Sequence, residues 1–128
     1  MTRKPLVKIA IVDRNQLFRE SIVEFLSLNG YQIILQLADK TDLLKNAANA
    51  VIPDVCLMQL SINECSIGEC IKSLRANWPT IKIILYSIEL ELDIFEVPLF
   101  GADAVLTNST SLIELERVLE LETVENEI

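Results

Sequence analysis

Four polar residues stand directly after short apolar runs, and these are the positions where the chain could do chemistry. In chain order they are Asp13 after VKIAIV, Gln59 after VCLM, Ser87 after KIILY and Asn108 after AVLT. A carboxylate can act as a nucleophile or a metal ligand, whereas a neutral amide oxygen is a poor nucleophile. The set therefore holds one acid, Asp13, and its chemistry depends on what surrounds that acid.

The apolar runs before these residues have the length and composition of strands. Apart from Lys8, the run from Val7 to Val12 is apolar and rich in β-branched residues, which is typical of a strand buried on both faces of a parallel sheet. The strands are expected at residues 7–12, 31–37, 55–58, 82–86 and 104–106.

Segments with helical periodicity separate the strands. In the first, Phe18, Ile22 and Leu26 recur on one face, and Asn29-Gly30 supplies a stop. Pro98 interrupts the stretch 89–100, which is expected to be a short or distorted helix. The other three helices are expected to begin at Thr41-Asp42, at Ser66 with its capping partner Glu69, and at Ser111 with Glu114.

This alternation predicts an α/β fold in one domain, residues 1–128. The expected architecture is a doubly wound, five-stranded parallel sheet of order 2-1-3-4-5 with five helices, a core over 6–120 and a fraying acidic tail at 122–128. Functional sites in such sheets lie beyond the carboxyl ends of the strands, where the four polar residues stand. Asp54 and Asp103, which flank strands, are expected to be solvated turn residues.

The composition excludes several classes of function. The chain has 128 residues, a net charge of −8 and no histidine, so it has no histidine general base, and it would repel nucleic acid. Cys56, Cys65 and Cys70 lack zinc-site spacing and are expected to be reduced structural thiols. No apolar run is long enough to span a membrane, so a cytoplasmic protein is expected, with protein partners favoured.

Four ordered blocks resemble a known family. KIAIVDRNQLFRE, PDVCLMQL at 53–60, the stretch from Pro79 to Ser87, and GADAVLTN at 101–108 resemble the CheY-like receiver domains of LuxR/NarL-type response regulators. The resemblance covers residues 6–120. It implies a flavodoxin-like fold and a role in two-component, phosphorelay signal transduction, commonly in control of transcription.

The departures from the family fall at its working positions. The resemblance implies that Gln59 stands where the family has its phosphoacceptor aspartate, Arg14 where it has a second acid, and Asn108 where it has a lysine. Asp13 and the switch residue Ser87 match the family. Gln59 is therefore not expected to accept a phosphoryl group, and Mg²⁺ binding is expected to be lost.

Two arrangements of this altered site remain open. Arg14 could pair with Asp13 across the metal position while Gln59 donates to Asp13 or Asn108, forming a polar cluster. Alternatively, Asp13 caps the following turn, and Arg14 points to solvent.

The predicted function is that of a pseudo-receiver, which is not an enzyme and acts through a protein partner or a homodimer. Its expected surface combines 89–100, the strand 104–106 and the last helix, with Phe95, Leu99 and Phe100 as candidate contacts. A DNA-binding output domain could be attached in a longer protein. The alternatives are a receiver phosphorylated elsewhere, at Ser61 or Glu64, and a small ligand-binding domain of the same fold.

Overall fold

The computed structural model describes residues 7–39, 52–59, 67–86, 101–106 and 112–123, together with Asp42 and Lys45. Its five strands form one parallel sheet in the order β2-β1-β3-β4-β5, as the sequence predicts. The strands are β1 (Lys8–Val12), β2 (Gln32–Leu37), β3 (Val55–Gln59), β4 (Lys82–Tyr86) and β5 (Ala104–Leu106).

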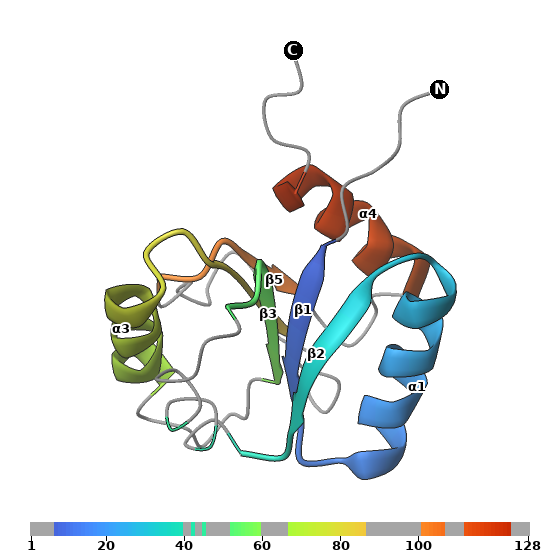
Figure 1. Ribbon diagram of the computed structural model, residues 1–128, viewed down its shortest axis with the longest axis horizontal. Helices are drawn as coiled ribbons and strands as arrows, with labels where there is room; N and C mark the ends of the chain where they lie inside the picture. Colours follow the sequence, from blue (N-terminus) through green and yellow to red (C-terminus); the bar gives the residue numbers. More distant parts are fainter. Residues whose placement is uncertain are drawn as a thin grey trace.

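Helices cover both faces of this sheet. Helices α1 (Gln16–Leu28) and α4 (Leu112–Thr123) lie on one face, and α3 (Ile67–Asn77) lies on the other (Figure 1). Asp42 and Lys45 are helical, but the rest of the helix expected from Thr41, and all of 89–100, lie outside the described residues. Within the described part of the chain, no helix has the length and apolar character needed to cross a membrane.

The central strands are buried because each has helices over both faces. Ile9, Ile11, Leu57 and Ile84 face α1 and α4, whereas their neighbours along each strand face α3. The α3 face buries the apolar stripe predicted for that helix, which is Ile67, Cys70, Ile71 and Leu74. Continuous apolar strands are what burial on both faces requires.

The second strand begins one residue later than the sequence predicted, because Tyr31 belongs to the turn that ends α1. Gly30 adopts φ +93°, and the N–H of Tyr31 donates to the carbonyl of Leu26 at 3.0 Å. Tyr31 therefore completes the C-terminal turn of α1, and β2 begins at Gln32. The predicted stop at Asn29-Gly30 is confirmed.

The cysteines inside the described residues are structural, as predicted. Cys56 and Cys70 are buried in the α3-facing core and are not joined in a disulfide, and Cys65 lies outside the described residues. Burial raises the pKa of the Cys56 thiol, with a smaller contribution from Cys70. The Cys56 side chain therefore stays protonated and unreactive.

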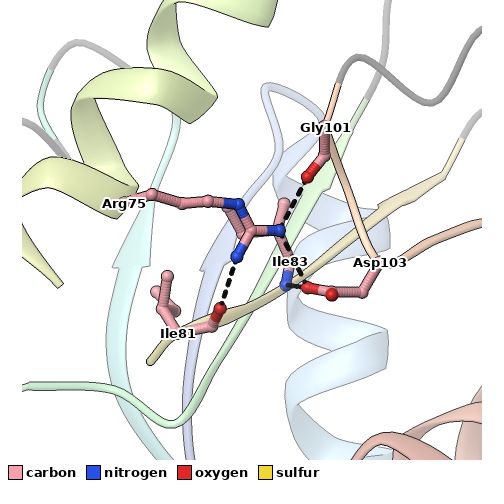
Figure 2. A network of polar contacts seen from close by, with 5 residues as sticks. All are labelled: Arg75, Ile81, Ile83, Gly101 and Asp103. Carbon is pink, nitrogen blue, oxygen red and sulfur yellow. Dashed lines mark hydrogen bonds and ion pairs between the residues drawn. The ribbon is translucent and has the colours of Figure 1, made fainter. Parts of the chain in front are cut away.

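At the amino ends of the strands, Arg75 joins α3 to β4 and β5. Its Nη1 donates to the carbonyl of Ile81 at 2.9 Å, and its Nη2 donates to the carbonyl of Gly101 at 2.7 Å and to Asp103 Oδ2 at 3.0 Å (Figure 2). The same Oδ2 accepts the N–H of Ile83 at 2.8 Å. Asp103 is therefore not the solvated turn residue that the sequence suggested, because it satisfies a strand N–H and an arginine together.

Asp54 plays a similar part at the amino ends of β1 and β3. Its Oδ2 accepts the N–H of Lys8 at 2.8 Å, and its main-chain N–H donates to the carbonyl of Lys8 at 2.7 Å. Asp54 is exposed, as expected for a turn residue, yet its carboxylate fixes the start of β1. Acidic side chains thus accept the main-chain N–H of Lys8 in β1 and that of Ile83 in β4.

Replacing Arg75 with Met is expected to lower the free energy of unfolding by about 1 to 2 kcal/mol, because the guanidinium loses its three hydrogen bonds. The effect is limited because the Arg75–Asp103 ion pair is partly exposed to water. Urea denaturation measures the change. Lys72→Met is the matched control, since Lys72 is an exposed cation on the same helix, and it should change the value by less than about 0.5 kcal/mol. Equal effects of the two changes would show that the Arg75 contacts do not stabilise the fold.

Candidate functional site

Three polar side chains meet at the carboxyl ends of adjacent strands. Asp13 directly follows β1, Gln59 ends β3 and Tyr86 ends β4. Val12 is paired with Met58, and Gln59 is paired with Tyr86, so the three residues form one row across the sheet. This row lies at the edge where the sequence placed the site.

Asp13 is the centre of this row. It is 1% exposed and the one buried charged residue among those described. Its Oδ1 accepts the N–H of Asn15 at 2.8 Å, and its Oδ2 accepts the hydroxyl of Tyr86 at 2.6 Å. A buried carboxylate is costly unless it is hydrogen-bonded, and here each oxygen has a donor.

The turn after β1 explains the first of these contacts. Asn15 is the N-cap of α1, and its side chain accepts the N–H of Phe18 at 3.0 Å. Asp13 in turn accepts the N–H of Asn15, so two successive side chains organise the passage from strand to helix. The prediction that Asp13 caps the following turn is confirmed, although this contact uses one oxygen only.

Tyr86 supplies the second contact from the opposite side of β3. Its side chain is buried, and its ring packs against Phe18 with centroids 5.8 Å apart and an interplanar angle of 46°. Burial first, and the hydrogen bond to Asp13 second, raise the pKa of the Tyr86 phenol well above its ordinary value. The hydroxyl therefore remains a protonated donor at physiological pH.

Arg19 brings a positive charge to the same place. Its Nη1 donates to the main-chain carbonyl of Asp13, and its charge lowers the pKa of Tyr86, partly opposing the effect of burial. The guanidinium is half-buried and reaches back from the first turn of α1. Arg19 therefore contributes a nearby cation without occupying a carboxylate oxygen of Asp13.

The predicted pairing of Arg14 with Asp13 is wrong. Arg14 is exposed and forms no ion pair with any residue that the structure describes. Asp13 points into the protein, whereas the next residue along the chain faces solvent, where a guanidinium keeps its hydration. The alternative that Arg14 points to solvent is confirmed.

Gln59 lies in the predicted place without the predicted contact. It is half-buried at the end of β3, and no hydrogen bond joins its side chain to Asp13. The other predicted site residues lie outside the described part of the chain: Ser87, Asn108, Phe95, Leu99 and Phe100, with the alternatives Ser61 and Glu64. Whether Gln59 contacts Asn108 stays a prediction.

Tyr86 and Arg19 were not singled out from the sequence. Tyr86 ends the run KIILY, where an aromatic residue is typical of a strand and gives no sign of a polar role. The available signal was its position, because it follows Ile84 by two residues and so shares the face of the sheet that α1 covers. Arg19 lies six residues after Asp13, close enough for a first-turn side chain to reach back.

The chain belongs to the response regulator receiver domain family, whose profile matches residues 9–120. This match covers most of the chain, and the parallel sheet of order 2-1-3-4-5 agrees with it. It confirms the predicted family and the role of that family in two-component systems. No curated protein is similar enough in sequence to match the chain.

Solved structures share this fold at low sequence identity. A LuxR-family DNA-binding response regulator from Staphylococcus aureus has a TM-score of 0.75 at 19% identity, covering 91% of this chain and 98% of its own. The chemotaxis response regulator CheY4 of Vibrio cholerae has a TM-score of 0.74 at 21% identity, with coverage of 91% and 98%. A CheY-like receiver from Methanospirillum hungatei has a TM-score of 0.72 at 22% identity, with coverage of 91% and 94%.

The residues present do not fit the Mg²⁺ ion that the family resemblance implies. Mg²⁺ requires several oxygen ligands in near-octahedral geometry, usually with carboxylates among them. Both oxygens of Asp13 hold hydrogen-bond donors, and position 14 is an exposed arginine. Within the described residues, no group of three or more acidic, cysteine or histidine side chains could hold a metal.

A double-mutant cycle with Tyr86→Phe and Asp13→Asn measures the bond between these two side chains. We expect a coupling energy of about 1.5 to 3 kcal/mol, the range for a hydrogen bond to a charged group, because Tyr86→Phe leaves a buried carboxylate oxygen without its donor. Urea denaturation of the four proteins supplies the values. Additive effects of the two changes would contradict the bond.

Proposed function

We propose that this chain is a receiver that takes up no phosphoryl group and acts by binding other proteins. The observation that carries the proposal is the state of Asp13. The carboxylate that would hold a metal in a phosphorylated receiver is buried here and already bonded to Tyr86 and Asn15. Its neighbour in the row across the sheet is Gln59, which offers a neutral amide.

The chemistry of Gln59 supports the proposal independently. Phosphoryl transfer to a side chain needs an anionic oxygen as nucleophile, and an amide oxygen carries no full charge. The surroundings of Asp13 also differ from those expected in the family, because Arg19 supplies a nearby positive charge and the Tyr86 hydroxyl donates a hydrogen bond to the carboxylate. The proposed receiver is therefore not an enzyme, and it performs no transfer to itself.

Signalling by such a receiver takes place through protein contacts. The S. aureus neighbour is a DNA-binding response regulator, and we propose that this receiver likewise controls a DNA-binding output domain in a longer protein. The receiver itself, with a net charge of −8, makes no direct contact with nucleic acid in this proposal. The buried cysteines Cys56 and Cys70, which form no disulfide, suit a reducing compartment, and we propose that the protein is cytoplasmic.

The proposed contact surface combines the 94–100 segment with β5 and α4. The 94–100 segment, IFEVPLF, holds five large apolar side chains in seven residues, more than a short amphipathic helix can bury on one face. Segments of this composition commonly mark interaction sites when they remain at the surface. The partner is a second copy of the chain or another protein.

The phosphorylation state is tested directly with acetyl phosphate and Mg²⁺. We expect the intact mass of the chain to stay unchanged, because Gln59 lacks a nucleophile and Asp13 is not open to a metal. The variant Gln59→Asp should also stay unlabelled, since the second acid and the lysine are still missing. The triple variant, which adds Arg14→Asp and Asn108→Lys to Gln59→Asp, restores the residue types that the family has at these three positions. It serves as the comparison for the two other proteins.

A phosphoryl group on the unmodified chain would overturn this proposal. If the label mapped to Ser61 or Glu64, the chain would instead be a receiver with a non-standard acceptor. Efficient labelling of Gln59→Asp alone would show that the second acid and the lysine matter less than the electrostatic argument requires.

Self-association through the 94–100 segment is tested with Phe95→Glu. If the segment joins two copies, the substitution should convert a dimer into a monomer in light scattering, because a charge is costly in an apolar interface. Circular dichroism serves as the control that the fold is retained. A monomer before mutation, over the full soluble concentration range, would remove the homodimer and leave a foreign partner.

A further inference from the structure

We infer that the hydroxyl of Tyr86 keeps Asp13 from binding a cation by occupying one of its carboxylate oxygens from within the protein. The inference rests on the proposed function and deepens it. It names the group that takes the place of a metal ion, and it assigns that role to a strand residue rather than to Arg14.

The path of the Tyr86 side chain is the first step. Tyr86 belongs to β4 and Asp13 follows β1, and β3 lies between these strands. Two strand spacings amount to about 9.6 Å, and a tyrosine side chain together with an aspartate spans that gap with one hydrogen bond between them. The observed Oη to Oδ2 distance of 2.6 Å shows that the gap is closed.

The Tyr86 side chain passes over the end of β3 at Gln59 on its way to Asp13. Gln59 is the direct neighbour of Tyr86 in the β3–β4 ladder, and partners in a parallel ladder point to the same face. Leu57 and Ile84, two pairs earlier and so on the same face, both lie in the core under α1 and α4. The phenol therefore bridges β4 to β1 over the strand end that carries Gln59.

The occupancy of the Asp13 carboxylate is the second step. A divalent cation binds carboxylate oxygens directly, and a donor already bound to an oxygen takes one of its two lone pairs and competes with the cation. The Asn15 N–H holds Oδ1 as part of the turn into α1, and the Tyr86 hydroxyl holds Oδ2. Arg19 reaches the main-chain carbonyl of Asp13 and leaves both oxygens to these two donors.

Phe18 explains why the hydroxyl stays in place. The Tyr86 ring packs against Phe18, whose N–H is held by the N-cap Asn15. The ring is therefore held by the same turn that supplies the other donor to Asp13. A cation that approaches Oδ2 therefore competes with a hydroxyl that cannot move away unless a buried aromatic ring moves with it.

The experiment compares two variants with Mn²⁺ as the probe. Arg14→Asp restores a second acid next to Asp13, and Arg14→Asp/Tyr86→Phe does the same without the hydroxyl. Mn²⁺ binding is measured by electron paramagnetic resonance of the free ion. We expect the double variant to bind Mn²⁺ at least about tenfold more tightly, because binding no longer breaks a hydrogen bond to a charged group. Tyr86→Phe keeps the ring and its packing, and Tyr86→Leu is the substitute if the Phe variant fails to fold.

Asp13→Asn in the double variant is the matched control and should abolish the gain. Equal affinities of the two variants, absence of binding in both, or a gain that survives Asp13→Asn would each overturn the inference. A purely structural role of Tyr86 would lower stability without any gain in affinity. Failure here leaves the proposed function standing, since that proposal is decided by acetyl phosphate treatment of the unmodified chain.

Discussion

The structure depends on how a charged carboxylate is kept inside the protein at the end of β1. Asp13 is 1% exposed, and burying an ionised group without partners would cost several kcal/mol, a large part of the roughly 5–15 kcal/mol that stabilises a domain. The main-chain turn into α1 supplies one donor, the end of β4 supplies another, and Arg19 lies nearby. Strands β1 and β4, which are not adjacent in the sheet, are thereby joined through side chains.

Polar groups are satisfied in different ways at the amino ends and at the carboxyl ends of the strands. At the amino ends, Arg75 and Asp103 satisfy carbonyl and N–H groups of α3, β4 and β5 in one partly hydrated network. At the carboxyl ends, the polar contacts converge on one buried acid. The first arrangement stabilises the packing of elements, and the second occupies the place where α/β sheets bind ligands.

Much of the fold follows from local patterns in the sequence. The strands predicted at 82–86 and 104–106 have the bounds of β4 and β5. Tyr31 was placed in a strand, since its type favours strands, but a hydrogen bond to Leu26 draws it into the end of α1. Such differences of one residue arise where two elements compete for the same backbone group.

The site was predicted in position and only partly in its contacts. Strand ends located Asp13 and Gln59, because a parallel sheet brings its carboxyl ends together. The partners of Asp13 depend on which face each side chain takes and on what lies across the sheet. Adjacency in sequence favoured Arg14, but neighbouring residues point in different directions, and the true donor comes from 73 residues away. Tertiary contacts of this kind leave no local pattern.

An internally bonded Asp13 has a consequence for how this receiver could carry a signal. In a phosphorylated receiver, new charge at the carboxyl edge would shift the balance between two conformations by its different affinity for each. In the proposed unphosphorylated receiver no such charge is added, and the Tyr86 phenol that bonds Asp13 stays protonated. A site that gains no charge cannot change the population of conformations in this way. In that proposal, a signal enters through the amount or affinity of a binding partner, which shifts the equilibrium by mass action.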